Sequence, residues 1–477
     1  MHRLGSDFSI AEAFEKIRSM GSCIWFDSAA RGPELEPGGD HAGRYSFLAA
    51  DPIDQIVAHV GGINPWPQLR RWCDALPSES VPDLPPFQGG MAGLWGYEAG
   101  AWLEPIERAL VDDLPTPAIS VGFYDWVICH DRLRSQAWLV SWGFEPPTFQ
   151  TNGSRARARA DAVLRCLNHR QKAIFPAEIC ASIEPLPTIA ASFETHWPGV
   201  WSNFSSSGYR SAIETIIESI RNGDSFQVNL AQRLLTRVQG DSWALMARLR
   251  AANAAPFAAY YDGGSFQVIS SSPEGFLRLR DRVVQTRPIK GTTARTGDEL
   301  VDRRLAAELS QSEKDRAENV MIVDLMRNDL SRVCEDDSVR VSQLCGIETY
   351  AHVQHLVSVV EGKLRDGVSA IDLLAACFPG GSITGAPKIQ AMRSISQLEP
   401  TTRGPYCGSL GYVSCGGDAE FNILIRTITA SQGWLQIPVG GGITLRSNAE
   451  SEERETWVKA EGMLRAIRSP AINSTAR

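Results

Sequence analysis

One lysine in the sequence stands in a setting that suits covalent chemistry. Lys290 lies in the segment Thr286-Arg-Pro-Ile-Lys-Gly-Thr-Thr-Ala-Arg295, between Pro288 and Gly291. Proline and glycine fix a turn and let a ligand approach the backbone. A lysine amine is a nucleophile near neutral pH only where its surroundings keep it unprotonated, and most lysines are simply exposed cations. The segment alone leaves both interpretations open, and the surface cation is the more frequent one.

Two glutamates on separate predicted helices could hold one divalent cation. Glu318 lies in a helix that we expect to begin near Ser312, and Glu455 shares a helical face with Glu452 and Lys459. Mg²⁺ suits such a pair, because it takes one or two carboxylates, keeps waters and completes its shell with an anionic ligand. The alternative is that Glu455 and Lys459 form only a solvated i,i+4 contact worth about 0.2–0.5 kcal/mol.

Two further segments could bind an anion. The glycine-rich run Phe378-Pro-Gly-Gly-Ser-Ile-Thr-Gly-Ala-Pro-Lys388 offers backbone N–H groups, and its Pro387 suits the first turn of a following helix. The run is not a nucleotide-binding P-loop, because Gly385 is followed by Ala and Pro where that motif has Lys and then Ser or Thr. Arg426, in an apolar run, could clamp a carboxylate or form a structural ion pair. For both segments a ligand site and a structural role stay equally open.

The sequence lacks the local patterns of common hydrolases. No Gly-x-Ser-x-Gly or Gly-x-Cys-x-Gly nucleophile turn occurs. His355, in His352-Val-Gln-His355, has neither the glutamate nor the spacing of a zinc-protease helix. A hydrolase triad and a glutaminase site are therefore both disfavoured.

The candidate residues need helices and strands to position them, and these alternate through the second half of the chain. Apolar residues recur at helical spacing over 209–220, and a strand-like segment follows over 226–230. The spacing of a capping box occurs at 310–313 and at 447–450, each a serine followed three residues later by a glutamate. These patterns predict an α/β arrangement without an internal repeat.

The N-terminal part predicts a sheet, clearest over 119–131, and then a surface helix over 154–174. Residues 181–208 are rich in Pro, Ser and Thr and predict a linker. We therefore expect an N-terminal region over 1–180 and a catalytic region over 200–468. The full 477 residues exceed one ordinary core, which favours two domains or one large α/β body.

Composition and charge exclude several classes of protein. The 55 acidic residues outnumber the 47 lysines and arginines, and the net charge of -8 gives no general attraction to nucleic acid or anionic lipid. The sequence has no run of about 18 apolar residues, and its acidic N-terminus does not fit a signal peptide. Ten scattered cysteines without a Cys-x-x-Cys pair predict reduced, mostly buried thiols. We expect a soluble, cytoplasmic protein that binds neither nucleic acid nor membrane.

Taken together, these segments resemble the chorismate-utilising enzymes. The motifs that carry the resemblance lie at 224–233, 272–276, 287–292, 321–330, 378–388, 407–412, 425–427 and 440–443, with weaker matches at 43–52 and 89–96. Eight ordered motifs in the second half are too many for chance. The resemblance implies a large two-sheet α/β sandwich with helices outside and the active site in the C-terminal half.

The resemblance also assigns roles to residues. It implies a magnesium ion held by Glu318 and Glu455, with chorismate, a dianion, as the substrate. The residues that it implies for substrate binding are Gly291, Thr292, His355, Tyr412, Arg426, Gly441, Gly442 and Lys459.

Two positions indicate which reaction of the family to expect. Gln227 stands where isochorismate and salicylate synthases carry a lysine that activates water, which argues against water addition. Lys290 stands where anthranilate synthases usually have Ala and the enzymes that form aminodeoxychorismate have Lys. By this resemblance Lys290 attacks ring carbon 2 and expels the carbon 4 hydroxyl, Glu274 supplies the proton, and ammonia then takes carbon 4. We expect 4-amino-4-deoxychorismate as the product, with anthranilate synthase component I as the alternative.

The resemblance further implies a partner. Because the sequence shows no glutaminase site, ammonia must come from solution or from a separate glutamine amidotransferase subunit. Two segments depart from the family pattern. Asn319 stands where members often have His after the metal glutamate, and 253–257 is looser than the family segment near a tryptophan pocket, which leaves an effector site open.

Overall fold

Two large β-sheets combine strands from both ends of the chain in a computed structural model, which describes residues 1–5, 7–28, 43–168, 189–190, 192–350 and 353–469. Within those residues the first sheet has 13 strands and the second has 10. In order across the first sheet the strands are β1 (His2–Arg3), β8 (Gln136–Ser141), β7 (Trp126–Asp131), β3 (Tyr45–Ala49), β2 (Ile24–Asp27), β14 (Phe257–Asp262), β15 (Phe266–Ser272), β24 (Thr427–Ser431), β25 (Trp434–Thr444), β13 (Gln227–Arg237), β12 (Trp201–Ser202) and β11 (Phe193–Glu194), with β21 (Gly385–Ala386) paired to β13.

The second sheet carries the segment of Lys290 at one edge. Its strands in order are β18 (Ile289–Ala294), β20 (Val353–Lys363), β17 (Val283–Thr286), β16 (Gly275–Arg280), β23 (Ala419–Asn422), β22 (Ser409–Ser414), β5 (Gly90–Trp95), β6 (Ile119–Tyr124) and β4 (Asp54–Ala58), with β19 (Arg340–Thr349) paired to β20. The long ladders, such as β13 with β25 and β5 with β22, are antiparallel.

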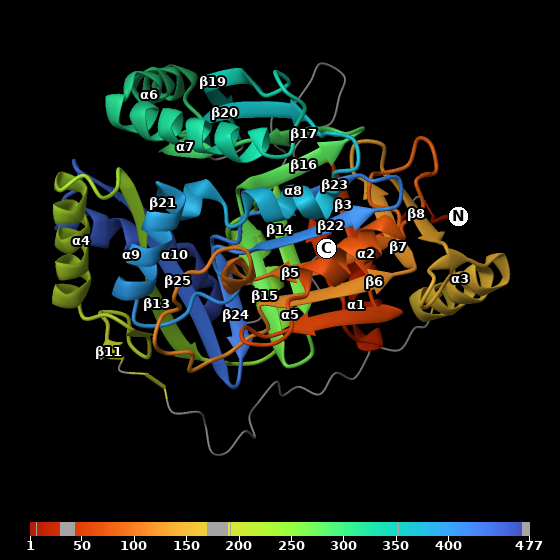
Figure 1. The fold of residues 1–477 in the computed structure, drawn as a ribbon. Coiled ribbons are helices and arrows are strands. Elements are labelled where there is room, and N and C mark those ends of the chain that lie inside the picture. The colour runs from red at the N-terminus through yellow and green to blue at the C-terminus, as the bar shows by residue number, and fades with distance from the viewer. Residues whose placement is uncertain (6, 29–42, 169–188, 191, 351–352, 470–477) are drawn as a thin grey trace.

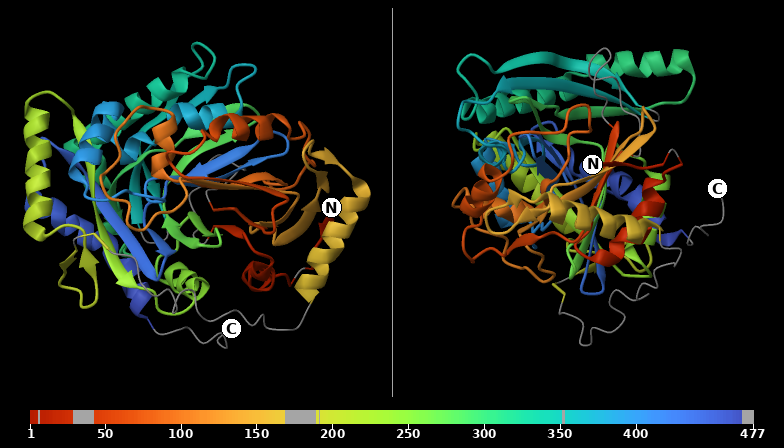
Figure 2. Two further views of the ribbon diagram at one scale, coloured as in Figure 1. Left: turned by 60° about the horizontal axis from the view of Figure 1, so that its bottom comes forward. Right: turned by 90° about the vertical axis from the view of Figure 1, so that its right-hand side faces the viewer.

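Helices cover the outer faces of both sheets (Figure 1 and Figure 2). They are α1 (Ile10–Ile17), α2 (Trp66–Asp74), α3 (Gly153–Asn168), α4 (Ser206–Arg221), α5 (Ser242–Ala252), α6 (Glu299–Gln311), α7 (Glu313–Ser331), α8 (Ala370–Cys377), α9 (Lys388–Leu398) and α10 (Ala449–Arg468). Apolar side chains of α1, α5 and α10 pack on the first sheet, and those of α2, α7 and α8 pack on the second. A third apolar cluster, including Ala49, Leu94, Tyr261 and Leu410, lies between the sheets. The expected two-sheet α/β sandwich is confirmed.

The two regions expected from the sequence, 1–180 and 200–468, share both sheets. Strand β2 pairs with β14, and β5 pairs with β22. The expected linker over 181–208 falls partly outside the described residues. The described part of the chain forms one interleaved body, so the boundary is a feature of the sequence that does not divide the sheets.

Most of the predicted elements form where the periodicity places them. The helix expected over 209–220 is α4, capped by Ser205, whose side chain accepts from the Gly208 N–H. The strand expected over 226–230 is the longer β13, and 119–131 forms β6 and β7. The helix expected over 154–174 is α3, and its last predicted residues lie outside the described part of the chain.

The two predicted capping boxes were each misplaced. Ser310 lies inside α6, and the cap of α7 is Ser312, which accepts from the Asp315 N–H at 3.3 Å. Both serines have an acidic residue three positions later, so spacing alone could not choose between them. Similarly, Asn448 caps α10, while Ser447 instead donates to Glu452 Oε1 at 2.6 Å.

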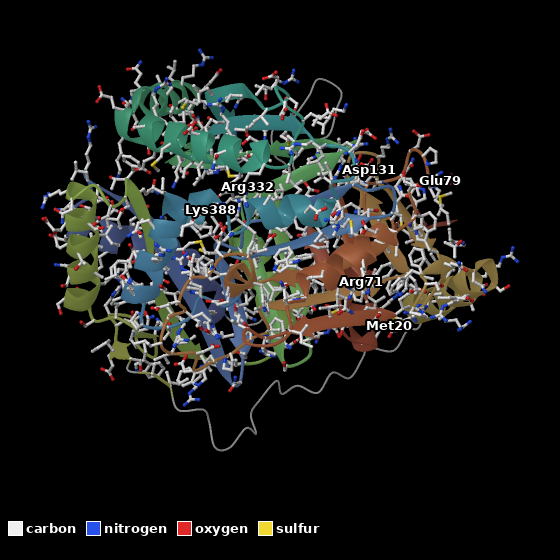
Figure 3. All side chains as sticks on the ribbon, viewed as in Figure 1. Met20, Arg71, Glu79, Asp131, Arg332 and Lys388 are labelled. Atoms are coloured by element: carbon white, nitrogen blue, oxygen red, sulfur yellow. The ribbon has the colours of Figure 1, made fainter. Side chains whose placement is uncertain are left out.

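The helix after the glycine-rich run is anchored at its first residue. Lys388, which Figure 3 labels, donates through Nζ to Asp329 Oδ2 of α7 at 2.6 Å and to the Cys377 carbonyl at the end of α8 at 2.8 Å. Asp329 is 3% exposed, so this ion pair is buried and fixes α9 against the second sheet's helices.

The cysteines and helices agree with the expectations from composition. The nine cysteines in the described residues are unpaired, and seven of them are buried. In the part of the chain that the structure describes, none of the helices combines the length and apolar character needed to cross a bilayer. The cytoplasmic location stays a prediction.

Candidate active site

Four residues predicted to act in catalysis or metal binding come together from four separate segments. Lys290 lies half-buried on β18, Glu274 lies between β15 and β16, Glu318 is on α7, and Glu455 is on α10. The positive charge of Lys290 acts to lower the pKa of all three carboxyl groups. We call these four residues the Lys290 cluster. The half-buried setting and three facing carboxyls disfavour a plain surface cation.

A β-bulge places Lys290 against α6 and α7. The register between β18 and β20 shifts between Lys290 and Thr292, so Gly291 is the extra residue. Gly291 has φ +73°, and a Cβ there would lie 2.7 Å from Leu309 Cδ1 and 3.0 Å from Asp315 Cγ. Only glycine satisfies both constraints, which explains the Lys-Gly pair.

Glu274 is held in a tight turn whose backbone is fixed on both sides. The Ser272 hydroxyl donates to the Ile423 carbonyl and accepts from the Glu274 N–H, while the Ile423 N–H donates to the Glu274 carbonyl at 3.0 Å. Burial raises the pKa of Glu274 to about 7, against the opposing effects of a hydrogen bond from Ser382 and the charge of Lys290. A carboxyl group with this pKa can give and take a proton near neutral pH.

The two proposed metal ligands differ in their surroundings. Burial raises the pKa of Glu318, an effect that the charges of Lys290 and Lys314 reduce. Burial also acts to raise the pKa of Glu455, but Lys459, which lies 2.7 Å from its Oε1, and the charges of Lys314 and Lys290 together outweigh burial and lower it.

The donor set fits magnesium. Glu318 Oε1 is buried and has no hydrogen-bond partner within the described residues. Among those residues no group of three or more His, Cys, Asp or Glu side chains is arranged to hold a metal alone. Magnesium needs only one or two carboxylates when waters and an anionic ligand complete its shell, so Glu318 and Glu455 are sufficient.

A second set of predicted residues surrounds Arg426. Thr292 Oγ1 lies 2.9 Å from His355 Nδ1. Burial, and then the charge of Arg426, lowers the pKa of His355 to about 4, so its ring is neutral at physiological pH. Burial lowers the pKa of Arg426, while Tyr406 and Glu455 act to raise it. Arg426 is therefore a cation adjoining both His355 and the Lys290 cluster, where it suits a substrate carboxylate.

Strand β25 passes beside α10 through the predicted glycines. A Cβ on Gly441 would lie 3.4 Å from Glu452 Oε2, 3.5 Å from Lys459 Nζ and 3.9 Å from Glu455 Oε1. Lys459 Nζ also donates to the Gly440 carbonyl at 2.9 Å. The predicted common face of α10 thus meets the glycine strand.

Gln227 adjoins the other predicted glycine. A Cβ on Gly442 would lie 2.0 Å from Gln227 Nε2. The Gln227 side chain is fully buried, yet neither its amide oxygen nor its nitrogen has a partner among the described residues. Burying an unpaired amide costs free energy, so this side chain is suited to a polar ligand.

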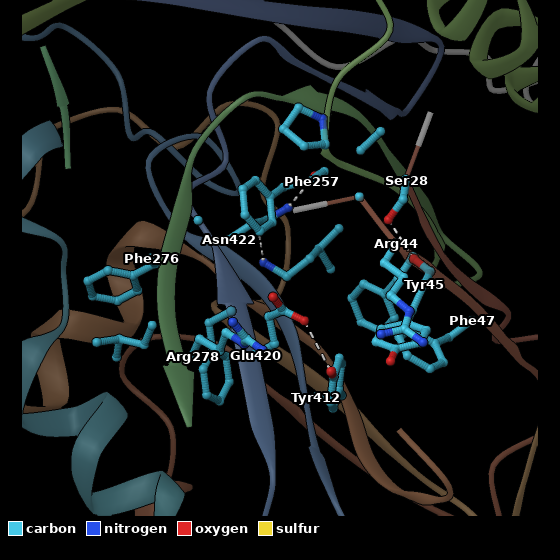
Figure 4. Close-up of a pocket in the computed structure, with 18 of the residues that line it drawn as sticks. Ser28, Arg44, Tyr45, Phe47, Phe257, Phe276, Arg278, Tyr412, Glu420 and Asn422 are labelled. Carbon is cyan, nitrogen blue, oxygen red and sulfur yellow. Dashed lines mark hydrogen bonds between the residues drawn. The ribbon is translucent and has the colours of Figure 1, made fainter. Parts of the chain in front are cut away.

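Tyr412 is not among the residues that the structure brings to the Lys290 cluster, and its assignment to the substrate site stays a prediction. Its hydroxyl donates to Glu420 Oε2 at 3.1 Å and accepts from Arg280 Nη2 at 2.9 Å, and its ring stacks on Phe87. It lines a cavity of about 80 Å³ between the sheets, which Phe257 of the 253–257 segment also lines (Figure 4). Strand β22 points this side chain into the sandwich, away from the Lys290 cluster. The tryptophan effector site stays an open prediction.

The sequence interpretation missed Tyr406, which directly precedes the 407–412 motif that contains Tyr412. Tyr406 is buried, interacts electrostatically with Arg426 and lies over the Arg403 guanidinium. The sequence signal that could have identified Tyr406 is its position in the Tyr-Cys-Gly segment directly before β22. Asn319, the departure from the family, donates to the Leu356 carbonyl and accepts from Ser358, so it ties α7 to β20.

Comparisons with known proteins agree with this arrangement. A family model described as chorismate binding enzyme matches residues 22–465. Aminodeoxychorismate synthase component 1 of Salmonella typhimurium is 37% identical over 89% of this chain and 90% of its own length. The protein of that name from Bacillus subtilis is 37% identical over 96% of this chain and 94% of its own.

Anthranilate synthases are also similar. Anthranilate synthase component 1 of Thermus thermophilus is 38% identical over 82% of this chain and 80% of its own. The crystal structure of anthranilate synthase component I from Streptococcus pneumoniae has a TM-score of 0.75 at 30% identity, covering 90% of this chain and 94% of that one. The family match spans most of the chain, and the relatives exceed 30% identity over most of their lengths. The chain therefore belongs to the family of chorismate-binding enzymes.

Proposed function

We propose that the protein converts chorismate and ammonia to 4-amino-4-deoxychorismate, the chemistry that the name of its aminodeoxychorismate synthase relatives indicates. The observation that carries the proposal is Lys290, which lies half-buried and whose charge acts on Glu274. Arg426 acts in the same way on His355, which pairs with Thr292 on the strand of Lys290. A nucleophile, an acid with a pKa near neutrality and a cation for a carboxylate are the groups that this reaction needs.

In the proposed reaction the unprotonated amine of Lys290 forms a bond from Nζ to ring carbon 2. The two ring double bonds shift, the carbon 4–oxygen bond breaks, and the oxygen leaves as water with a proton from Glu274. Ammonia then attacks carbon 4, the double bonds shift back, and the carbon 2–Nζ bond breaks. Glu274 recovers a proton from the added nitrogen, so both residues return to their starting states.

The remaining residues bind and orient the substrate. Arg426 and Lys459 supply positive charge for substrate carboxylates, and the neutral ring of His355 adds no charge of its own. Glu318 and Glu455 would hold Mg²⁺, which when bound supplies positive charge to the carboxylate on the ring. The buried, unpartnered Oε1 of Glu318 supports that assignment.

Product identification tests the proposal. The purified protein is incubated with chorismate, ammonium and magnesium, and we expect 4-amino-4-deoxychorismate on chromatography with mass detection. Lys290→Ala should lower turnover by orders of magnitude while chorismate binding survives, because only the nucleophile is lost. Lys363→Ala, which removes an exposed lysine of the same sheet, is the matched control and should behave as wild type. Unchanged turnover and product in Lys290→Ala would contradict the covalent mechanism.

The second candidate is anthranilate synthase component I, favoured by the similarity to the enzymes of that name. Anthranilate as the direct product of the wild-type protein would establish it. Isochorismate or salicylate would instead indicate water addition, and chorismate binding without turnover would indicate a regulatory protein.

We further propose that a separate glutamine amidotransferase subunit supplies the ammonia. The relatives' names, component 1, imply a second component. The isolated chain should use ammonium salts, better as pH rises because more ammonia is unprotonated, and should fail with glutamine until the subunit is added. Glutamine-dependent turnover by the pure chain alone would contradict the proposal.

A further inference from the structure

The glycine-rich run 378–388 forms a short turn in which several backbone carbonyls accept hydrogen bonds. Residues 381–383 make a single 3-10 turn, in which the Thr384 N–H donates to the Gly381 carbonyl. The Thr384 hydroxyl donates to the Gly380 carbonyl at 2.9 Å, and Arg403 Nη1 donates to the Ile383 carbonyl at 2.9 Å. The turn is thus tied within itself and to Arg403, and the anion site that the sequence left open stays a prediction.

The glycines let this turn pass between packed side chains. A Cβ on Gly380 would lie 2.8 Å from Ile423 Cδ1, and one on Gly381 would lie 2.5 Å from Leu325 Cδ2 of α7. Both contacts are shorter than real Cβ atoms show, so larger residues would push the turn away. The turn is therefore held in place on two sides, and so is the side chain of Ser382 in its middle.

Ser382 Oγ donates to Glu274 Oε1 at 2.7 Å. We propose that Ser382 is a positioning residue for Glu274: its hydroxyl occupies Oε1, so the acidic proton is carried by Oε2. This inference rests on the proposed role of Glu274 as the acid that protonates the leaving oxygen. The glycine-rich run then serves to hold the Ser382 hydroxyl against the carboxyl group of Glu274.

The hydrogen bond also has an energetic consequence. It is stronger to the carboxylate that forms when Glu274 gives up its proton than to the neutral acid, so it makes Glu274 a better acid. The charged or titratable groups that face Glu274 are Lys290 from β18 and Cys407 from the segment before β22. Burial raises the pKa of the Cys407 thiol to about 12, so it stays neutral at the pH values of the test and leaves Ser382 and Lys290 as the groups that act on Glu274.

The test is the pH profile of kcat for Ser382→Ala, at saturating chorismate and magnesium. Total ammonium is adjusted at each pH so that unprotonated ammonia stays constant. Loss of the hydrogen bond should move the alkaline limb of the profile up by about 1–2 pH units. It should also lower kcat at the plateau by about 10-fold, because the acid is weaker. KM for chorismate should change less than about 2-fold.

Two further variants make the test specific. Ser382→Thr keeps a hydroxyl and should restore the wild-type limb, whereas Ser396→Ala removes a serine of α9 that bonds within its own helix and should leave the profile unchanged. If Ser382→Ala raised KM for chorismate and left the alkaline limb of the kcat profile where it is in the wild type, the inference would be overturned, because Ser382 would then contact the substrate. An alkaline limb at the wild-type position together with an unchanged kcat would also overturn the inference. Failure of the proposed function is separate, since it would show as anthranilate formed by the wild-type protein.

Discussion

The buried ion pair of Arg403 and Glu399 gives the most quantitative prediction, because each of its hydrogen bonds has a defined partner and distance. Arg403 Nη2 and Nε donate to the two Glu399 carboxylate oxygens at 2.6 and 2.9 Å. Arg403 also donates to the carbonyls of Ile383 and Asn229, each at 2.9 Å. Arg403→Leu therefore leaves a buried carboxylate and two carbonyls without these donors.

The expected loss follows from these contacts. Removing one partner of a buried ion pair costs about 3–5 kcal/mol, and each carbonyl that loses its donor adds about 1 kcal/mol, for roughly 5–7 kcal/mol in all. Unfolding entropy of about 2.1 cal/mol/K per residue amounts to roughly 1 kcal/mol/K for 477 residues. Arg403→Leu should therefore lower Tm by about 5–7 °C in differential scanning calorimetry.

Two comparisons decide whether the reasoning holds. The double variant Arg403→Leu with Glu399→Leu should be more stable than Arg403→Leu alone, because no unpaired charge is left inside. Arg454→Leu breaks an exposed pair with Glu450, 70% and 61% exposed, and should change Tm by less than about 1 °C. If Arg403→Leu lowered Tm by as little as Arg454→Leu does, the argument from burial would be refuted.

Three further predictions concern the site itself. Glu318→Gln and Glu455→Gln should each weaken magnesium binding in calorimetric titration by about 10-fold or more, because a neutral amide replaces a carboxylate ligand; wild-type affinity would contradict the assignment. Gly442→Ala should lower kcat/KM by about 10-fold by displacing the Gln227 amide, with Gly462→Ala, in open space, as an unaffected control. The lowered pKa of His355, about 4, stabilises the fold above pH 6.5, and this contribution is lost as pH falls through 4. The stability difference between wild type and His355→Asn should therefore shrink on acidification by up to about 3 kcal/mol, and a difference independent of pH would contradict it.

Local patterns predicted much of the site because its residues lie in short motifs whose types are chemically constrained. Lys290 followed by Gly291 is one case, since the bulge and the close contact with Leu309 admit only glycine. The assignment of Tyr412 to the substrate site was made from its motif alone. Tyr406 directly precedes that motif, and only the register of β22 shows that the Tyr412 side chain lies between the sheets. Register depends on partner strands far away in the chain, which local spacing does not encode.

The same distant pairing shaped the fold prediction. Alternation of helices and strands was sufficient to expect an α/β arrangement, and the resemblance to the chorismate-utilising enzymes implied the two-sheet sandwich, but neither gave the order of strands in each sheet. Strand β2 pairs with β14 in the first sheet, and β16 pairs with β23 in the second. These partners come from different predicted segments, and the choice among them is decided by packing between the sheets rather than by propensity.

The pairing of β5 with β22 bears on how the protein is made. The Gln88 N–H donates to the Ser414 hydroxyl at 3.0 Å, a contact between residues 326 positions apart. At about 5–20 residues per second, a ribosome needs on the order of 15–65 s to synthesise that interval. For that time the edge of β5 that pairs with β22 in the folded protein has no partner strand, and the nascent chain is exposed to aggregation. We expect its yield in cells to depend on chaperones that hold the early strands until the last ones emerge.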